Sequence, residues 1–406
     1  MLTQLAGLED GYYGVESKPH RKIMPMGFVL FQMSGDLEEL EQALNRTPSD
    51  RRAMFGRESC SALIVPLQKS EDILFSHVTW SVYQTMLRIQ KLYKFEYSFN
   101  GTAGQTVPST VISMSSYPGT LLSIDDFYLC ESGLAVTETT IGNSNSSLWK
   151  NIKPENSILS WIRVMVANRL ASVGKEWALI FAQFNSGTYN NQFMILDYKK
   201  FKPGRPLPKS GLFTVVEQAP GLCVTQDLTI IITKQGYWPS YNVPYFPEIY
   251  NLTGNLDLLK KHGDWFSYHK TPRALIFKRD WSKVVDMESL KKLMRYNDFK
   301  NDPLSRCNCT PPYSAENAIS ARNDLNVRNG TYPFKQLGHR PHGATDMKAT
   351  NYAMFKKLQF FAISGPTFDD QPPFKWSSTD FGVDLPHEGH PDLFAFEPVV
   401  NKWQYF

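Results

Sequence analysis

The chain has 406 residues, of which 42% are apolar and 20% are charged, enough for a sizeable hydrophobic core in one large domain or two average ones. Its 43 Lys and Arg residues and 39 Asp and Glu residues leave a net charge of only +4, so the composition does not indicate a nucleic-acid partner. No run of the sequence reaches the ~18 apolar residues that a membrane-spanning helix needs, so no transmembrane segment is predicted.

The first 59 residues predict a polar start, an apolar stretch at residues 23–32 and one amphipathic helix. The helix begins at Ser34, because leucines recur at helical spacing after it. Residues 47–52 are polar and predict an exposed linker that a protease could trim. Residues 1–10 have neither the basic start nor the apolar core of a signal peptide.

Two short apolar runs, residues 60–66 and 73–77, are separated by the polar residues 68–72 and predict an antiparallel hairpin. Cys60 is the first residue of the leading strand. A buried cysteine that only packs is the ordinary interpretation of such a residue. The alternative is a nucleophile that becomes a new N-terminus when the bond between Ser59 and Cys60 is cut. The position of Cys60 at the start of the strand favours this alternative.

Apolar residues recur at three- and four-residue spacing between residues 80 and 97, which predicts a helix packed on the hairpin, and again at residues 158–171. Few periodic runs follow residue 297, and residues 304–313 and 365–376 predict ordered coil over the core rather than a separate domain. Strand clusters interrupted by helices, without strict alternation of the two, predict antiparallel sheets covered by helices in one domain. The predicted strands are residues 110–114, 121–129, 134–141, 178–184, 192–197, 212–217 and 224–233.

The cysteines and the potential glycosylation sites bear on the compartment. An odd number of cysteines leaves at least one outside any disulfide, and the chain has five: Cys60, Cys130, Cys223, Cys307 and Cys309. Six Asn-X-Ser/Thr triplets together favour a secreted or lysosomal protein, and they begin at Asn45, Asn100, Asn145, Asn251, Asn308 and Asn329.

Several long strings carry a family resemblance: Cys60-Ser61-Ala62-Leu63-Ile64, His77-Val78-Thr79-Trp80, Gly187-Thr188-Tyr189-Asn190-Asn191-Gln192, Leu293-Met294-Arg295-Tyr296-Asn297-Asp298-Phe299 and Glu316-Asn317-Ala318-Ile319-Ser320-Ala321-Arg322-Asn323-Asp324-Leu325-Asn326. They resemble the phospholipase B-like family of lysosomal or secreted glycoproteins, and the resemblance covers nearly the whole chain. It implies the N-terminal-nucleophile hydrolase fold, an α+β, four-layer αββα sandwich of two antiparallel sheets.

The resemblance also implies a domain organisation and a compartment. Residues 1–59 correspond to the remnant of an upstream segment, and residues 60–406 form the hydrolase core, the two together making a single domain. Family members carry a closely spaced cysteine pair, so we expect a disulfide between Cys307 and Cys309, which is a feature of oxidising compartments. For the full-length protein we expect the lysosomal lumen or secretion.

The activity that the resemblance implies is removal of fatty-acyl chains from phospholipids, without a cofactor. The Cys60 thiol would attack the Ser59 carbonyl in a self-cleavage, and the α-amine so released would then activate the thiol as a base. We expect the cleaved upstream fragment to stay bound without a covalent link. Two alternatives are left open: an amidase acting on linear amides, and a non-catalytic glycoprotein with an inherited hydrolase fold.

Further site residues are predicted from the same resemblance. Asn190 and Asn191 match a Thr-Asn-Asn stretch that supplies the oxyanion-hole amide in related enzymes, although adjacent asparagines also favour turns. Relatives place a polar side chain near the nucleophile at the position of Thr140. The alternative interpretation is that Thr140 is an ordinary residue at the end of a strand. Arg273 begins an apolar run that predicts a strand and approaches the thiolate; an exposed arginine at a strand edge is its alternative.

His77 and Trp80 depart from the pattern of bile-salt-hydrolase-like relatives, which place an Arg and an Asp in the corresponding hairpin region. We expect His77 to tune the thiol or to bind substrate, and Trp80 to form a wall of an acyl pocket. No metal site is predicted, because the remaining candidate histidines lack partners at ligand spacing: His339, His342, His387 and His390.

Overall fold

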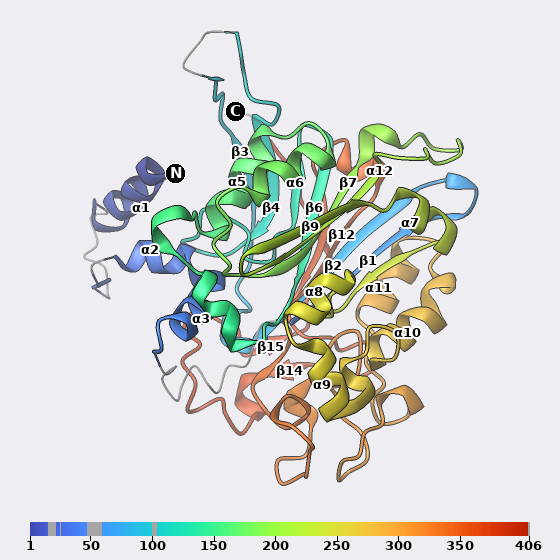
Figure 1. Cartoon of the computed structure of the whole chain (residues 1–406). Coiled ribbons are helices and arrows are strands. Elements are labelled where there is room, and N and C mark those ends of the chain that lie inside the picture. The colour runs from blue at the N-terminus through green and yellow to red at the C-terminus, as the bar shows by residue number, and fades with distance from the viewer. Residues whose placement is uncertain (15–21, 25, 47–58, 100–103, 405–406) are drawn as a thin grey trace.

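The computed structural model describes residues 1–14, 22–24, 26–46, 59–99 and 104–404 and contains two seven-stranded antiparallel sheets (Figure 1). The first sheet has the order β10-β1-β2-β12-β13-β16, with β11 also paired to β2. Its strands are β1 (Ser59–Pro66), β2 (Ile73–Val82), β10 (Trp238–Ser240), β11 (His342–Ala344), β12 (Asp346–Thr350), β13 (Phe361–Ser364) and β16 (Val399–Val400).

The second sheet follows the chain order from β3 to β9. Its strands are β3 (Ile89–Lys94), β4 (Val111–Ser116), β5 (Tyr128–Cys130), β6 (Leu134–Thr140), β7 (Asn191–Asp197), β8 (Phe213–Ala219) and β9 (Leu222–Asp227). A separate two-stranded ribbon pairs β14 (Phe374–Lys375) with β15 (Leu393–Phe394).

Three buried clusters define four layers. One apolar cluster joins the inner faces of the two sheets, with Ala62 and Phe75 from the first and Met194 and Val215 from the second. A second cluster packs the outer face of the second sheet against α5 (Ser160–Leu170) and α6 (Gly174–Ala182). A third packs the outer face of the first sheet against α10 (Pro272–Asp280) and α11 (Met287–Met294). The predicted α+β, four-layer αββα arrangement is therefore confirmed (Figure 1).

The other helices lie around these layers. In the part of the chain that the structure describes, no helix has the length and apolar character to cross a bilayer. The upstream helices are α1 (Leu2–Gly14), α2 (Gly27–Gln32) and α3 (Ser34–Ala43), and the remaining ones are α7 (Thr229–Gln235), α8 (Pro247–Leu252), α9 (Asn255–His262) and α12 (Tyr352–Phe355).

The predicted hairpin is confirmed, and its register sets the direction of the Cys60 side chain. Cys60 lies opposite Thr79, and Ala62 lies opposite His77. Because alternate residues of a strand face opposite sides of a sheet, Cys60 and His77 face the same inner layer as Ala62. Trp80 has the other parity and faces the helices on the outside of the first sheet.

Five predicted elements are wrong in whole or in part. Of residues 121–129, predicted as a strand, only the last two lie in β5, and of residues 224–233, predicted as a strand, residues 229–233 belong to α7. Residues 80–97 form the end of β2, a short 3-10 turn and β3 rather than a helix, because this segment connects the two sheets. Residues 178–184, predicted as a strand, belong to α6 up to Ala182. Residues 273–277, predicted as a strand, lie in α10, which begins at Pro272, a residue that favours the first turn of a helix.

Beyond α11, residues 304–313 and 365–373 form turns and coil, as predicted. The same part of the chain also supplies β11, β12, β13 and β16 of the first sheet and the short helix Tyr352–Phe355, which the sequence did not predict. This region is tied down by buried polar contacts: the Arg322 guanidinium donates to the Thr367 carbonyl at 2.6 Å and pairs with Asp324 at 2.7 Å. Cys307 and Cys309 form a disulfide here. The predicted linker at residues 47–52 lies outside the described residues.

Candidate active site

Cys60 lies in a small buried cluster with two other polar side chains. Its Sγ is 3.9 Å from Oε1 of Glu138, which lies near the end of β6. The Cys60 sulfur, a ring nitrogen of His77 and a carboxylate oxygen of Glu138 all lie within 4.8 Å of one another. All three side chains are buried, so the chemistry of the thiol is set by these neighbours rather than by water.

The main chain of Cys60 is held from two sides. Its amide nitrogen donates to Oδ1 of Asn242 at 2.9 Å, and its carbonyl oxygen accepts from Nη1 of Arg273 at 2.5 Å. Nη1 of Arg273 also donates to Oδ1 of Asn242 at 2.9 Å, which links the two contacts. Asn242 adopts a left-handed backbone conformation with φ of 67°, which asparagine tolerates better than most residues. The peptide groups on both sides of the Cys60 Cα are thus fixed.

Arg273 contacts the main chain of Cys60 rather than its thiol, and it reaches the site from a helix rather than from a strand edge. Its side chain is buried, its Nη2 donates to the Tyr241 carbonyl at 2.8 Å, and its guanidinium stacks on the Trp80 ring at 4.3 Å. Burial lowers the pKa of Arg273 to about 10, so the guanidinium keeps its charge at neutral and acidic pH. It therefore brings a positive charge to the carbonyl side of Cys60.

The Glu138 carboxylate has contacts on both oxygens. The Thr140 hydroxyl donates to Oε2 at 3.4 Å, and the Asn191 amide donates to the same oxygen at 3.0 Å in the orientation that satisfies its neighbours. The Thr140 carbonyl accepts from Nδ2 of Asn242 at 2.8 Å. Thr140 and Asn191 thus contact Glu138, the neighbour of the thiol, rather than the thiol itself.

Asn190 lies differently from Asn191. Its Nδ2 donates to both carboxylate oxygens of Glu39, each at 2.9 Å, and to the Gly187 carbonyl at 2.8 Å. Its Oδ1 accepts from Nε2 of Gln218 at 2.9 Å. The Asn190 amide, which was predicted to face an oxyanion, is therefore engaged by α3 and β8, and Asn191 is the member of the pair that contacts Glu138.

His77 is completely buried in the inner layer. Within the described residues neither ring nitrogen has a hydrogen-bond partner, and the main chain of Glu138 approaches the ring without meeting hydrogen-bond geometry. Burial lowers the pKa of the imidazole well below its usual value, and the charge of Lys348, which lies opposite His77 in the sheet, lowers it further. His77 is therefore a neutral imidazole next to Cys60.

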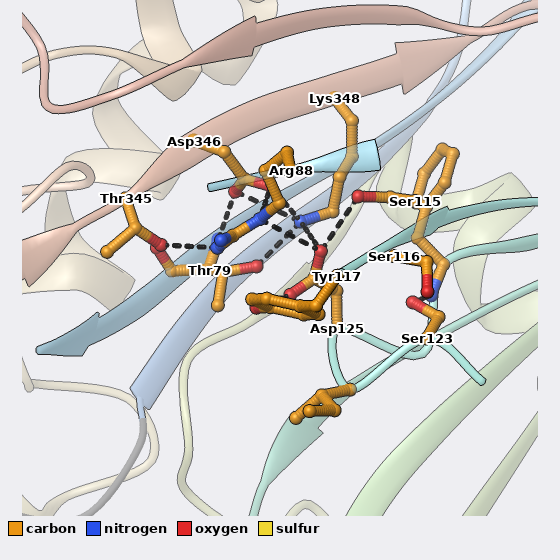
Figure 2. Close-up of polar contacts among 12 residues, drawn as sticks. Thr79, Arg88, Ser115, Ser116, Tyr117, Ser123, Asp125, Thr345, Asp346 and Lys348 are labelled. Carbon is orange, nitrogen blue, oxygen red and sulfur yellow. Dashed lines mark hydrogen bonds and ion pairs between the residues drawn. The ribbon is translucent and has the colours of Figure 1, made fainter. Parts of the chain in front are cut away.

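Next to His77, Lys348 belongs to a buried ion-pair cluster with Arg88, Asp125 and Asp346 (Figure 2). Lys348 Nζ lies 2.7 Å from Asp346 Oδ2 and 3.1 Å from Asp125 Oδ2, and Arg88 Nε lies 3.2 Å from Asp346 Oδ2. Burial alone would raise the pKa of Asp125, but the charges of Lys348 and Arg88 outweigh burial and hold it well below its usual range. Two cations thus balance two carboxylates.

The cluster reaches the nucleophile strand through Thr79. Lys348 Nζ donates to the Thr79 hydroxyl at 2.6 Å, and the Thr79 amide donates to Asp346 Oδ1 at 3.0 Å. Thr79 is the residue opposite Cys60 in the hairpin. The ion-pair cluster therefore fixes the strand position that faces the thiol.

The structure corrects the role predicted for Trp80. Its ring is fully buried on the outer face of the first sheet, and its Nε1 donates to the Ile319 carbonyl at 3.2 Å. Since Cys60 faces the inner layer, Trp80 cannot line a pocket with the thiol across the thickness of the sheet. It is a core residue that supports Arg273.

Two of the histidines outside the hairpin are engaged far from Cys60 in the sequence. His387 stacks on Trp376 at 4.1 Å between ring centres, and His339 contacts Asp380 at 3.0 Å. Among the described residues, the group with ligand atoms close enough to hold a metal ion is Cys60, His77 and Glu138. A soft sulfur, an imidazole nitrogen and a carboxylate oxygen are a ligand set that zinc accepts.

The similarity to known proteins extends over nearly the whole chain. Residues 1–401 match the profile of the family described as phospholipase B. The chain belongs to the phospholipase B family. It is 50% identical to phospholipase B-like 2 of Bos taurus over 406 residues, which is 99% of this chain and 68% of the bovine one. It is 51% identical to phospholipase B-like 2 of Homo sapiens over 407 residues, with the same shares covered.

More distant members of the phospholipase B family and one solved structure are also similar to the chain. It is 40% identical to phospholipase B-like protein B of Dictyostelium discoideum over 405 residues, covering 98% of this chain and 68% of that one. A variant of conjugated bile acid hydrolase from Clostridium perfringens aligns over 85% of this chain and 97% of its own, with a TM-score of 0.38 and 10% identity.

Two residues of the site were missed by the sequence analysis. Glu138 is an acidic residue inside a strand that is otherwise apolar or threonine, and a charge in such a place was the available signal. Asn242 gave no local signal beyond its place in a turn-like Tyr-Asn-Val-Pro segment, because its partner Cys60 is 182 residues away in the sequence.

Proposed function

We propose that the protein is an acyl hydrolase whose nucleophile is Cys60, exposed as a new N-terminus by self-cleavage between Ser59 and Cys60. The observation that carries the proposal is the double contact on the Cys60 main chain, through Asn242 and Arg273. After cleavage, Asn242 Oδ1 would hold the new α-amine where it now holds the amide. The amine would therefore stay beside the thiol of the same residue, which is what an N-terminal nucleophile requires.

Self-cleavage needs a base other than the α-amine, because that nitrogen is still an amide in the uncut chain. Glu138 supplies one: its Oε1 faces Sγ of Cys60 at 3.9 Å. The carboxylate takes the thiol proton, and the sulfur adds to the Ser59 carbonyl carbon. The carbon–nitrogen bond then breaks, the Cys60 nitrogen takes up the proton and leaves as an amine, and a thioester remains. Water hydrolyses the thioester to a Ser59 carboxylate and the Cys60 thiol.

Turnover on a substrate then follows with the α-amine as base. The amine takes the thiol proton, the thiolate attacks the acyl carbonyl, and the ammonium protonates the leaving group. Asn191 is the better candidate for an oxyanion donor, because its amide contacts Glu138, the neighbour of the Cys60 thiol, whereas the amide of Asn190 is held by Glu39 in α3. To donate to an oxyanion, the Asn191 amide would have to exchange its contact with Glu138 for one with the substrate. The family name favours fatty-acyl esters of phospholipids as the substrate class.

We also propose that the upstream segment stays bound after the cut. Asp36 in α3 accepts from the Ser160 amide at 3.1 Å and from the Thr188 hydroxyl, and all three residues are buried. Glu39 in the same helix binds Asn190, next to the site. These contacts do not depend on the Ser59–Cys60 bond, so they should keep the fragment bound after that bond is broken.

A lysosomal or secreted location is part of the proposal, and the exposure of the acceptor asparagines supports it. Four of them are exposed: Asn45, Asn251, Asn308 and Asn329. Asn145 uses its Nδ2 in a hydrogen bond to the Leu252 carbonyl at 3.0 Å, which makes it a poorer acceptor, and Asn100 lies outside the described residues. Enzymatic removal of N-glycans from protein made in a secretory host should therefore lower its apparent mass.

The test compares cleavage in purified full-length chains over time, followed by fatty-acid release from phosphatidylcholine vesicles. Glu138→Gln keeps the shape of the side chain but removes its basicity, so this variant should stay largely uncut. Glu248→Gln changes an exposed glutamate at the start of α8 and should cleave like the wild type. Rapid cleavage of Cys60→Ala, or lipid hydrolysis by a chain that remains uncut, would contradict the proposal.

A further inference from the structure

Three different metal-binding groups converge at Cys60. The thiol, a ring nitrogen of His77 and a carboxylate oxygen of Glu138 lie within 4.8 Å of one another. With zinc–sulfur and zinc–oxygen bonds of about 2.3 and 2.0 Å, tetrahedral geometry puts the sulfur and oxygen about 3.5 Å apart. The observed distance of 3.9 Å from Sγ to Oε1 needs only a small contraction to match it.

The imidazole gives an independent indication. His77 is completely buried, and within the described residues neither of its nitrogens has a hydrogen-bond partner. Buried polar groups normally have partners, and a bound ion is one of the partners that can satisfy such an imidazole.

We propose that Cys60, His77 and Glu138 form a binding site for a thiophilic divalent cation such as Zn²⁺, and that the bound cation blocks the nucleophile. The thiol loses its proton on binding, and the sulfur lone pair that would attack a carbonyl is donated to the metal instead. Three protein ligands leave one position for water, which is a common zinc arrangement. The block rests on the proposed function, whereas the binding does not.

The second oxygen of Glu138 supports the site from outside. Oε2 accepts from Asn191 and Thr140, so the carboxylate is oriented with Oε1 toward the sulfur. Such contacts to a ligating carboxylate typically contribute 10- to 100-fold to metal affinity. Hard cations such as Mg²⁺ prefer all-oxygen sites and should not compete here.

The binding test is a titration of the purified full-length chain with Co²⁺, which reports a thiolate ligand by its sulfur-to-metal charge-transfer absorption. The wild type should show this absorption, and Zn²⁺ should abolish it. His77→Asn and Glu138→Gln should weaken binding at least tenfold. Cys223→Ser, which removes a cysteine on β9 away from the site, should bind normally. Circular dichroism checks that each variant is folded. If His77→Asn does not fold, Glu138→Gln remains as the test of the site.

The functional test adds Zn²⁺ or Mg²⁺ to freshly purified uncut chain and follows cleavage. Zn²⁺ should stop cleavage, a chelator should restore it, and Mg²⁺ should have no effect. No charge-transfer absorption, or binding that survives in both ligand variants, would overturn the site. Zn²⁺ that binds and accelerates hydrolysis would overturn the block. If the chain binds zinc but never cleaves, the metal site stands and the proposed function is contradicted. If the chain cleaves but does not bind zinc, the proposed function stands and the metal site is contradicted.

Discussion

Lys348 Nζ and Asp125 Oδ2 lie 3.1 Å apart and come from opposite sheets, with both side chains fully buried. Lys348 is on β12 of the first sheet, and Asp125 lies in the connection from β4 to β5 of the second. Ser115 on β4 also donates to Asp125 Oδ2, at 2.8 Å. The pair is therefore a charged link across the largely apolar layer between the two sheets (Figure 2). Lys348 also lies opposite His77 in the first sheet.

Lys348→Met should destabilise the fold. The change leaves the buried carboxylates of Asp125 and Asp346 with only Arg88 as a cation, and removing one partner of a buried ion pair costs about 3–5 kcal/mol. Denaturant unfolding followed by fluorescence measures the loss. Lys260→Met removes a surface lysine whose partner Asp257 is also exposed, and its unfolding midpoint should not move. An equally small effect of both changes would show that the buried cluster does not stabilise the fold.

The stability of the protein should depend on pH through His77. An unfolded histidine titrates near pH 6.5, whereas burial keeps the folded imidazole neutral to much lower pH. Below pH 6.5 the unfolded state therefore binds a proton that the folded state does not, so stability falls as the pH falls, by up to about 1.4 kcal/mol per pH unit. His77→Asn should flatten this slope between pH 7 and pH 5.

The control for this pH dependence is His269→Asn, which changes an exposed histidine. Its stability should follow that of the wild type across the range. Parallel pH curves for the wild type and His77→Asn would show that His77 does not contribute the slope.

Trp80→Ala should reduce stability rather than change acyl-chain preference. The ring is fully buried among helix-packed apolar residues, and truncating a buried aromatic ring costs ~3–5 kcal/mol. Trp80→Phe keeps most of the volume and should leave chain preference unchanged in a vesicle assay with different acyl lengths. If Trp80→Phe shifts the acyl-chain preference without loss of stability, Trp80 does line the acyl pocket.

Arg273→Lys should slow self-cleavage. Nη1 and Nη2 of Arg273 together contact Cys60, Asn242 and Tyr241, and a single ammonium cannot span these acceptors. Loss of one charged hydrogen bond of ~1.5–3 kcal/mol corresponds to a rate reduction of about tenfold or more. The measurement is the half-time of cleavage. Arg279→Lys, whose partners Asp280 and Asp302 lie away from the site, should cleave at the wild-type rate.

The sequence predicted the secondary-structure elements correctly where the local pattern and the tertiary structure agree. The hairpin from Cys60 to His77 and the helix at residues 160–170 follow directly from alternation and helical spacing. It failed where long-range packing decides. Residues 178–184 and 273–277 are apolar enough for a strand or a helix, and their packing on the outside of the sheets selects the helix. Pro272 was a local signal for the start of the second helix that the sequence analysis did not use.

The same distinction applies to the site. Cys60 could be found because its place at the start of a strand and its family strings are local features. Glu138, Asn242 and Lys348 could not be assigned, because they meet Cys60 or His77 only through strand pairing and turns that bring distant residues together. The parity of β2 separates His77 from Trp80, and the two could be placed on opposite faces only once the strand was known to continue to Val82.

The most direct measurement is N-terminal sequencing of the larger fragment from full-length protein matured at acidic pH, together with its activity on phospholipid vesicles. The account predicts that the fragment begins Cys-Ser-Ala-Leu-Ile and that fatty-acid release appears with it. Cys60→Ala should remain folded and uncut. A fragment that begins elsewhere, or full activity in a chain whose Ser59–Cys60 bond is intact, would contradict the assignment of Cys60 as an N-terminal nucleophile.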